Sequence, residues 1–442
     1  MKYERIGKFQ RKGPPATEKF DMTRPPVNQN KALMIPVRGF ARLRKHLHLG
    51  KVNKINMEGI RAPYILLLNH NAFYDFYIML NSIAPDRGIF PAAVDDYLGR
   101  EEVLRKLGAI PKRKYTADLS ILRNCRKTLK DGKIFGIYVE ARYSLCGLTE
   151  VIPKSVAQLV RGSGVPVVTL TCHGHHIYDP FWGNHRVRWV KPISADMTLA
   201  YAPEELKQHS VEEIYDRICE LLYNDDFRWQ SENRVKVTYK KRAEGLHKVL
   251  YKCPHCNTEY ETDSKYDEVF CKKCGKRWKL NYYGELEAND GNTEFKFPTD
   301  WYKWEREEVK KEVDAGTYRF ESPVEVNDLP NSKSFIYMGK GNLVHDMTGF
   351  HLKGIREYDG EPFSMEINAA EQYAVHIEYN YRYGQKRDCI DLNTIDDTWY
   401  VFPTKDKFAI TKISLATEEI FKKIWADRQK AKELEAEKSE KE

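Results

Sequence analysis

The sequence predicts an α/β domain followed by a small cysteine module and a mostly β region. Between about residues 51 and 226, short apolar runs alternate with helical stretches, which is typical of a largely buried sheet. Two Cys-x-x-Cys pairs follow, and after Asn281 the chain is rich in Tyr, Phe, Trp and Gly, which favours β structure. The expected segments are an N-terminal arm with a basic amphipathic helix (1–50), an α/β domain with a mixed sheet flanked by helices (51–226), the cysteine module (250–281), the mostly β region (282–425) and a charged tail (426–442).

The composition is that of an ordered soluble protein. The chain has 442 residues, of which 41% are hydrophobic and 31% charged, and its formal net charge is +8. No apolar stretch reaches the roughly 20 residues of a membrane-spanning helix, and the first residues lack the apolar core of a signal peptide. We therefore expect a cytoplasmic protein. The modest basic excess favours a solvated surface, with attraction to the phosphates of a nucleic acid or an anionic membrane as the alternative.

The N-terminal 50 residues divide into two parts. Residues 1–30 are polar and contain two Pro-Pro pairs, which predicts an extended or poorly ordered arm. A helix is expected from Pro36 to about Leu47, because proline suits the first helical position. Its apolar residues keep roughly helical spacing, and its basic face comprises Arg38, Arg42, Arg44 and Lys45. Such a helix packs on its own domain or lies on a membrane surface.

The other expected elements follow from the length and periodicity of each run. Apolar runs predict strands at Tyr64–Leu68, Ile134–Val139, Val165–Thr171, Ser334–Met338, Ala374–Tyr381 and Trp399–Pro403. Helical spacing predicts helices at Leu119–Leu129, Val156–Arg161, Val211–Tyr223 and Ala416–Ala426. Residues 225–249 are basic and polar and are expected to form a connector.

The most informative motif directly follows the run Tyr64–Leu68. There His70 stands at the end of an expected buried strand, and Asp75 lies five residues further on. One turn of chain can bring Asp75 back to hold the imidazole in one tautomer. A base held in this way can take a proton from a hydroxyl group. The spacing alone is weak evidence, and the alternative is a structural histidine near a helix start.

Two later segments carry charged residues at comparable places. Lys112 and Arg113 come just after a turn, and Glu140 and Arg142 follow an apolar strand. Arginine can donate two hydrogen bonds to one phosphate. Because ligands of open α/β sheets collect at the carboxyl ends of strands, these residues are expected to gather in one site. The alternative for each is a structural ion pair.

In this order, the blocks resemble the PlsC-type glycerolipid acyltransferase family, typified by lysophosphatidic acid acyltransferase. The blocks are Asn-His-x4-Asp, a Gly followed by a basic cluster, Glu-x-Arg-x-Ser and Val-Pro-Val-Val, and they cover about residues 50–225. The resemblance implies that His70 is the general base for an acceptor hydroxyl and that Asp75 orients it. The resulting alkoxide would attack an acyl thioester.

The resemblance also implies an acceptor site. In it, Arg113 and Arg142 bind the acceptor phosphate, and Glu140 shapes the pocket. Two positions depart from the family pattern: Lys114 and Tyr143 stand where the family usually has Arg, so that Arg113 and Arg142 each fit one position early. The acceptor is therefore left open. The alternative function is a catalytically degenerate protein that binds lipid or a partner.

The cysteine pairs have the spacing C-x2-C-x14-C-x2-C, which is typical of a zinc ribbon. Four thiolates arranged tetrahedrally give a closed structural zinc site, so no position is left for a substrate. The expected ligands are Cys253, Cys256, Cys271 and Cys274. The alternative is two unrelated pairs of free thiols. The cluster Cys172–His176 is interpreted as structural, because sequential neighbours seldom converge on one ion.

Together these observations predict an enzyme of phospholipid biosynthesis. It would transfer a fatty acyl group from acyl-coenzyme A or acyl carrier protein to a hydroxyl of a lysophospholipid-like acceptor. Zn²⁺ would be structural. Nucleic acid is not an expected partner, and peripheral contact with the inner face of an anionic membrane, through the basic helix, is left open.

Overall fold

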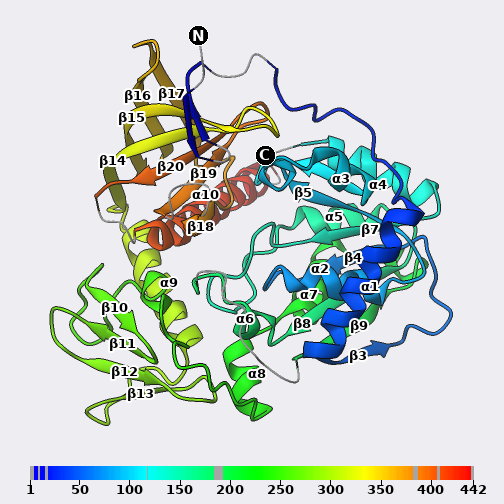
Figure 1. The fold of residues 1–442 in the computed structure, drawn as a ribbon, viewed down its shortest axis with the longest axis horizontal. Coiled ribbons are helices and arrows are strands. Elements are labelled where there is room, and N and C mark those ends of the chain that lie inside the picture. Colours follow the sequence, from blue (N-terminus) through cyan, green and yellow to red (C-terminus); the bar gives the residue numbers. More distant parts are fainter. Residues whose placement is uncertain are drawn as a thin grey trace.

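Three β-sheets organise the chain in the computed structural model (Figure 1). The structure describes residues 4–7, 10–14, 18–116, 118–183, 193–381, 387–405 and 409–439. Within these residues, a seven-stranded sheet lies on the right of Figure 1, a four-stranded sheet at the lower left and a nine-stranded sheet at the upper left.

The seven-stranded sheet is mixed, as the sequence predicts. In sheet order its strands are β3 (Leu49–Ile55), β9 (Ile193–Tyr201), β8 (Val167–His173), β4 (Ile65–Leu68), β7 (Ile134–Tyr138), β5 (Gly88–Ala93) and β6 (Ala109–Lys112). Strand β9 pairs antiparallel with β8 and parallel with β3, so β3 and β9 run against the other five strands. The carboxyl ends of β4, β7 and β8 therefore meet at one edge.

Helices cover both faces of this sheet. The four residues of β4 are fully buried, and because side chains alternate along a strand, they serve two cores. Leu66 and Leu68 pack in the core that contains α2, whereas Ile65 and Leu67 pack in the core that contains α4, α5 and α7. The helices of this part are α1 (Lys31–His48), α2 (Tyr74–Ser82), α3 (Glu101–Lys106), α4 (Ser120–Lys130), α5 (Ser155–Arg161), α6 (His175–Tyr178), α7 (Val211–Leu222) and α8 (Asp226–Glu232).

The cysteine module is built around an antiparallel sheet. Its strands are β10 (Thr262–Lys265), β11 (Glu268–Cys271), β12 (Arg277–Leu280) and β13 (Leu286–Ala288). Trp278 of β12 packs edge-on against Trp301 of the following helix, with ring centroids 4.8 Å apart. This contact joins the module to the C-terminal region, with which it shares one hydrophobic core.

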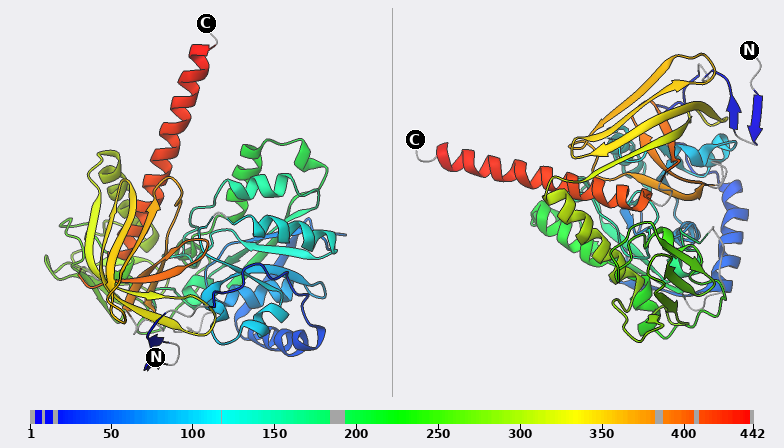
Figure 2. Two further views of the ribbon diagram at one scale, coloured as in Figure 1. Left: turned by 90° about the horizontal axis from the view of Figure 1, so that it is seen from above. Right: turned by 90° about the vertical axis from the view of Figure 1, so that its left-hand side faces the viewer.

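The C-terminal region combines a sheet with two helices. Its strands are β14 (Arg319–Asp328), β15 (Phe335–Asp346), β16 (Gly349–Arg356), β17 (Pro362–Asn368), β18 (His376–Tyr381), β19 (Arg387–Asn393) and β20 (Thr398–Pro403). Helix α9 (Pro298–Asp314) packs against α10 (Ile410–Ser439). The outer half of α10 projects away from the rest of the molecule (Figure 2).

The N-terminal segment is more ordered than the expected arm. Strands β1 (Glu4–Gly7) and β2 (Gln10–Lys12) form a hairpin, and β2 pairs in parallel with β15. Gln10 Nε2 donates to Asn327 Oδ1 at 3.2 Å. The polar composition of residues 1–30 does not predict this pairing, because the partner strand β15 lies far along the chain. Residues 1–3, 8–9 and 15–17 of the arm lie outside the described residues.

The helices also differ from expectation in extent. Helix α1 begins at Lys31 rather than Pro36, because Asn30 Oδ1 accepts a hydrogen bond from Leu33 N (3.1 Å) and caps an earlier turn. Helix α8 lies within the expected connector, and α9 was not expected. Helix α10 extends through most of the expected tail to Ser439, and residues 440–442 lie outside the described residues.

Candidate active site

His70 lies two residues beyond the carboxyl end of β4, and its backbone is fixed on both sides. His70 N donates to Glu140 Oε1 (2.9 Å), and His70 O accepts from Ser144 N (2.7 Å). The ring Nδ1 lies 3.3 Å from Asp75 Oδ2. The structure thus brings His70 and Asp75 together at the expected spacing.

Asp75, in the first turn of α2, is completely buried and accepts several hydrogen bonds. Its Oδ2 accepts from Asn71 N (2.7 Å) and Ala72 N (3.0 Å), and its Oδ1 lies 2.5 Å from His175 Nδ1. Burial alone would raise the pKa of Asp75, but the hydrogen bonds from His175 and His70 outweigh burial and hold the pKa at about 2. Asp75 is therefore a carboxylate at neutral pH.

Two tyrosines pack against the His70 ring. Tyr138, the last residue of β7, is stacked at a centroid distance of 4.0 Å, and Tyr143 lies at 4.2 Å. The His70 side chain retains 17% exposure. Since Nδ1 faces Asp75, Nε2 is the ring nitrogen that a ligand can reach. Tyr143 stands where the family that the sequence resembles usually has Arg, so an aromatic ring lies beside His70 at that position.

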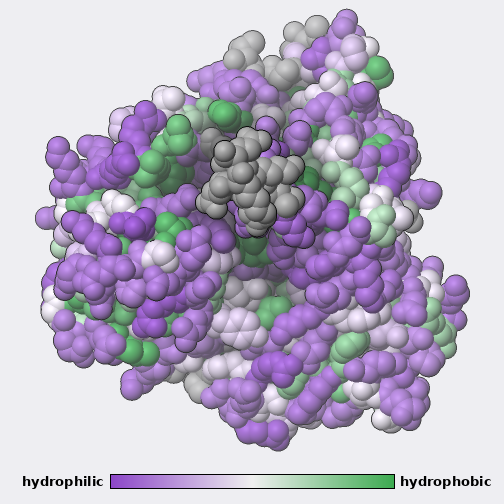
Figure 3. Space-filling model, turned by 180° about the vertical axis from the view of Figure 1, so that it is seen from behind, coloured by the Kyte–Doolittle hydropathy of each residue, from purple (hydrophilic) through white to green (hydrophobic). Residues whose placement is uncertain are grey.

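His70 lines a cavity of about 900 Å³. Much of its wall is apolar, and this part comprises Pro36, Val37, Phe40, Phe73, Phe76, Phe90, Leu104 and Leu107. The volume and lining suit a ligand with a long apolar part. Figure 3, the face opposite to that of Figure 1, is mostly hydrophilic but is hollowed near its centre, where hydrophobic side chains are visible at depth.

The polar part of the cavity wall draws on the C-terminal region. Lys114 Nζ lies 3.1 Å from Asp391 Oδ2 of β19 and 3.7 Å from Asp95 Oδ2. His376 and Glu378 of β18 also line the cavity, and His376 Nε2 lies 3.0 Å from Glu378 Oε1. The charges on this wall are therefore of both signs. A contribution of β18 to the cavity was not visible in the sequence.

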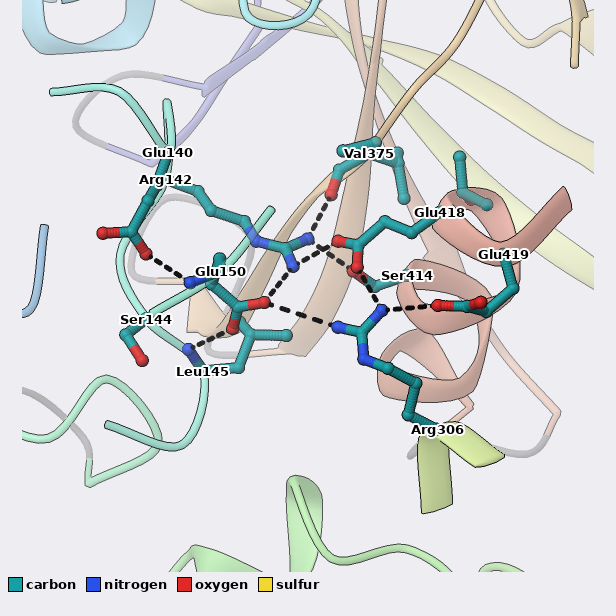
Figure 4. A network of polar contacts seen from close by, with 12 residues as sticks. Glu140, Arg142, Ser144, Leu145, Glu150, Arg306, Val375, Ser414, Glu418 and Glu419 are labelled. Atoms are coloured by element: carbon teal, nitrogen blue, oxygen red, sulfur yellow. Dashed lines mark hydrogen bonds and ion pairs between the residues drawn. The ribbon is translucent and has the colours of Figure 1, made fainter. Parts of the chain in front are cut away.

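Glu140 and Arg142, which follow β7, belong to a buried network rather than to the open part of the cavity (Figure 4). Glu140 accepts from His70 N and, through Oε2, from Glu150 N (2.8 Å). Burial raises the pKa of Glu140 to about 8, although both backbone hydrogen bonds oppose this shift. Glu140 thus positions the backbone of His70.

The guanidinium of Arg142 is held by acidic groups. Its Nη2 lies 2.7 Å from Glu150 Oε2 and 2.5 Å from Glu418 Oε1 of α10. Its Nη1 donates to Val375 O (3.1 Å) and Ser414 Oγ (2.5 Å). Arg142 contributes to the cavity wall, but both terminal nitrogens are already paired.

Arg113 is likewise buried and turned toward the C-terminal sheet. Its Nη1 donates to Thr398 Oγ1 at 2.6 Å, and Arg113 does not line the cavity around His70. The phosphate-binding role expected of Arg113 and Arg142 stays a prediction. The structure brings Glu140 and Arg142 close to His70 but not Arg113.

The expected zinc ligands converge at one end of the cysteine module. The sulfur atoms of Cys253, Cys256, Cys271 and Cys274 all lie within 4.8 Å of one another. Cys256 Sγ is 3.7 Å from Cys271 Sγ, and Cys253 Sγ is 3.8 Å from Cys274 Sγ. A tetrahedral ion with Zn–S bonds of about 2.3 Å requires sulfur atoms about 3.8 Å apart, so this cluster is compatible with zinc.

Sequence reasoning missed His175, which contacts the carboxylate of Asp75. The cluster Cys172–His176 was interpreted only as structural. A signal was nevertheless present: β8 pairs in parallel with β4, with Leu170 opposite Leu68, so the residues after both strands leave the sheet at the same edge. Expecting the two strands as neighbours would have placed His175 near His70.

Comparison with known proteins supports acyl transfer at a general level. Residues 51–173 match the model of the Acyltransferase family. A solved structure, that of the 1-acyl-sn-glycerophosphate (LPA) acyltransferase PlsC from Thermotoga maritima, matches over 43% of this chain and 76% of that chain, with 21% sequence identity and a TM-score of 0.34. No curated protein sequence matches the chain.

Proposed function

We propose that this protein transfers a fatty acyl group from a thioester to the hydroxyl of a lysophospholipid-like acceptor, with His70 as the general base. The observation that carries the proposal is the pairing of His70 Nδ1 with the buried carboxylate of Asp75 at the wall of a large, partly apolar cavity. The match of residues 51–173 to the Acyltransferase family supports the same chemistry.

The proposed step uses the two ring nitrogens of His70 differently. Asp75 holds the proton on Nδ1, so the lone pair of Nε2 accepts the proton of the acceptor hydroxyl. The oxygen then attacks the thioester carbonyl, forms the new ester bond and displaces the thiolate of the donor. The imidazolium returns its proton to that thiolate, which leaves as a thiol, and His70 is neutral again.

The donor we propose is acyl-coenzyme A or acyl carrier protein, with the acyl chain against the apolar wall. For the acceptor, the headgroup would meet the polar part of the cavity wall, which includes Lys114, Asp95 and Glu378. A wall with charges of both signs does not select a phosphate by charge alone, so the acceptor panel has to include anionic, zwitterionic and amine headgroups.

Peripheral contact with a membrane is proposed through α1. Ile35, Phe40 and Leu43 are 74%, 50% and 56% exposed, and nearby Phe73 is 48% exposed. Phe40 and Phe73 also line the cavity, so this surface adjoins the entrance to the proposed lipid site. The basic face is weaker than expected, because the Arg38 guanidinium donates to the carbonyls of Pro85 and Asp86. The side chains of Arg44 and Lys45 lie outside the described residues.

No helix in the described part of the chain has the length and apolarity needed to span a membrane. Flotation with vesicles of neutral lipid, and with vesicles containing anionic lipid, tests the proposed contact. The variant Phe40→Glu should float less than the wild type. The matched variant Ile355→Glu, at an exposed apolar position of β16, should float as the wild type does.

The decisive test of activity is mass spectrometry of lipid products. Purified protein is incubated with acyl-coenzyme A or acyl carrier protein and the acceptor panel, and the same is done with His70→Ala. The matched control is His209→Ala, which removes a histidine whose side chain is 40% exposed. We expect an esterified product from the wild type and the control but none from His70→Ala. Tight lipid binding without turnover in the wild type would instead support the catalytically degenerate binding protein.

A further inference from the structure

His175, Asp75 and His70 form an array in which Asp75 contacts both histidines. His175 lies two residues beyond the end of β8, and its ring is completely buried. Its Nδ1 is 2.5 Å from Asp75 Oδ1, while His70 Nδ1 is 3.3 Å from the other oxygen, Oδ2. One carboxylate therefore joins two imidazoles.

The contact places a proton on Nδ1 of His175. Because Asp75 is a carboxylate and can only accept, the proton between the two atoms belongs to Nδ1. The other ring nitrogen, Nε2, is buried and has no hydrogen-bond partner among the described residues. A buried nitrogen left unpaired is unfavourable, so packing alone does not account for a histidine at this position.

A metal ion does not explain the arrangement. Cys172 Sγ lies within 4.8 Å of the ligand atoms of Asp75 and His175. However, nitrogen and oxygen ligands at about 2.0–2.2 Å from a tetrahedral zinc ion stand more than 3 Å apart. The separation of 2.5 Å between Asp75 and His175 is that of a short, charge-assisted hydrogen bond.

The backbone around both histidines is tied together. Asn69 Oδ1 accepts from Cys172 N (2.8 Å), and Asn71 Nδ2 donates to Cys172 O (3.1 Å). On the other side, Asp226 accepts from Gly174 N (2.7 Å) and His176 N (2.8 Å). The segment that carries His175 is thus held in register with the segment that carries His70.

We propose that His175 is a positioning residue for acyl transfer: its Nδ1–H bond orients the Asp75 carboxylate so that Oδ2 meets Nδ1 of His70. This inference rests on the proposed function. Without the bond from His175, hydrogen-bond donors contact only Oδ2 of Asp75. The plane of the Asp75 carboxylate, which aligns the His70 ring, is then no longer fixed. Loss of the donor also concentrates the negative charge of Asp75 on its contact with His70, which makes the imidazole a stronger base.

Two variants separate positioning from packing. His175→Phe keeps an aromatic ring and removes the donor, whereas His175→Asn places an amide N–H near the position of Nδ1. We expect the kcat of His175→Phe to fall 10- to 100-fold with little change in the KM for the acceptor. The acidic limb of its pH–rate profile should shift to higher pH. His175→Asn should recover most of kcat and the wild-type profile, and His209→Phe serves as the surface control.

A second measurement does not depend on activity. The His70 ring is titrated by nuclear magnetic resonance in the wild type, in His175→Phe and in His175→Asn, with thermal unfolding as the check on folding. If His175→Phe does not fold, His175→Gln replaces it, because the longer amide places its N–H away from Oδ1. An unchanged His70 titration in the variants without the donor overturns the inference.

The two proposals fail in different ways. If the wild type transfers acyl groups but His175→Phe has the same kcat and pH profile, the positioning role is wrong and the function stands. If no donor and acceptor pair gives a product, the proposed function is wrong. A shifted His70 titration would then still support the structural coupling of His175, Asp75 and His70.

Discussion

Arg142 and Glu418 form an ion pair of 2.5 Å in which each side chain is only 1% exposed. The pair joins the segment after β7 to helix α10, 276 positions further along the chain. Glu150 and Arg306 extend the same network. The C-terminal region is therefore bonded to the segment that fixes the backbone of His70.

Arg142→Met should destabilise the protein strongly. The substitution leaves the carboxylates of Glu150 and Glu418 buried with less compensating charge, and breaking a buried pair costs about 3–5 kcal/mol. The free energy of unfolding, measured with denaturant, checks this. The control is Arg319→Met, because Arg319 and Glu321 are 53% and 51% exposed and such pairs contribute about 0–1 kcal/mol. Equal effects of the two substitutions would contradict the prediction.

Asp75→Asn should remove most of the activity. The amide cannot supply the charge that stabilises a protonated His70, and general base catalysis contributes about 10²–10⁴-fold. We expect kcat to fall by that order in the product assay. Asp396→Asn, at an exposed turn, is the matched control. A kcat within about twofold of the wild type would argue against the orienting role of Asp75.

The protein should lose stability as the pH falls below 6.5, partly through buried histidines. Burial lowers the pKa of His345 from 6.5 to about 3, and that of His376 to about 3 as well. Between these values the unfolded chain binds a proton that the folded protein does not, so the free energy of unfolding falls as the pH falls. The slope is about 1.4 kcal/mol per pH unit for each such histidine.

His345→Gln isolates one of these contributions. Its amide can still bond with Tyr318 and Thr417, the partners of the His345 ring, but it does not titrate. Unfolding is measured between pH 4 and pH 6.5 for the variant and the wild type. If the free energy of unfolding of the variant fell with pH as steeply as that of the wild type, His345 would not account for the slope.

The cysteine module should contain one zinc ion per chain. Elemental analysis of the purified protein measures the ion, and Cys253→Ser should lose it together with thermal stability, because binding of a structural zinc contributes to folding. Cys219→Ser, at a partly exposed thiol of α7 outside the cluster, should retain the ion. A zinc-free protein of unchanged stability would refute the zinc site.

Much of the fold follows from local patterns. The run Ile134–Val139 and the helical spacing of Val211–Tyr223 predict β7 and α7 to within one residue at each end. Such elements are predictable because apolar residues recur along the sequence with the period of the strand or helix that buries them. Helix α9 was missed, since its polar and aromatic residues also suit a β region.

The site was predictable in part for the same reason. His70 and Asp75 are five residues apart, so a local turn suffices to join them. The bond between Asp75 and His175 spans 100 positions, and that between Arg142 and Glu418 spans 276. Such contacts depend on which strands become neighbours and which helix closes the structure, and neither is encoded in the spacing of a motif.

The pairing of β2 with β15 has a consequence for how this chain is made. Gln10 leaves the ribosome early, but Asn327, with which it bonds, lies 317 positions later. The hairpin of β1 and β2 therefore has no sheet to join until most of the protein has been synthesised. The N-terminal segment can therefore join this sheet only late in translation, after β14 and β15 have been synthesised.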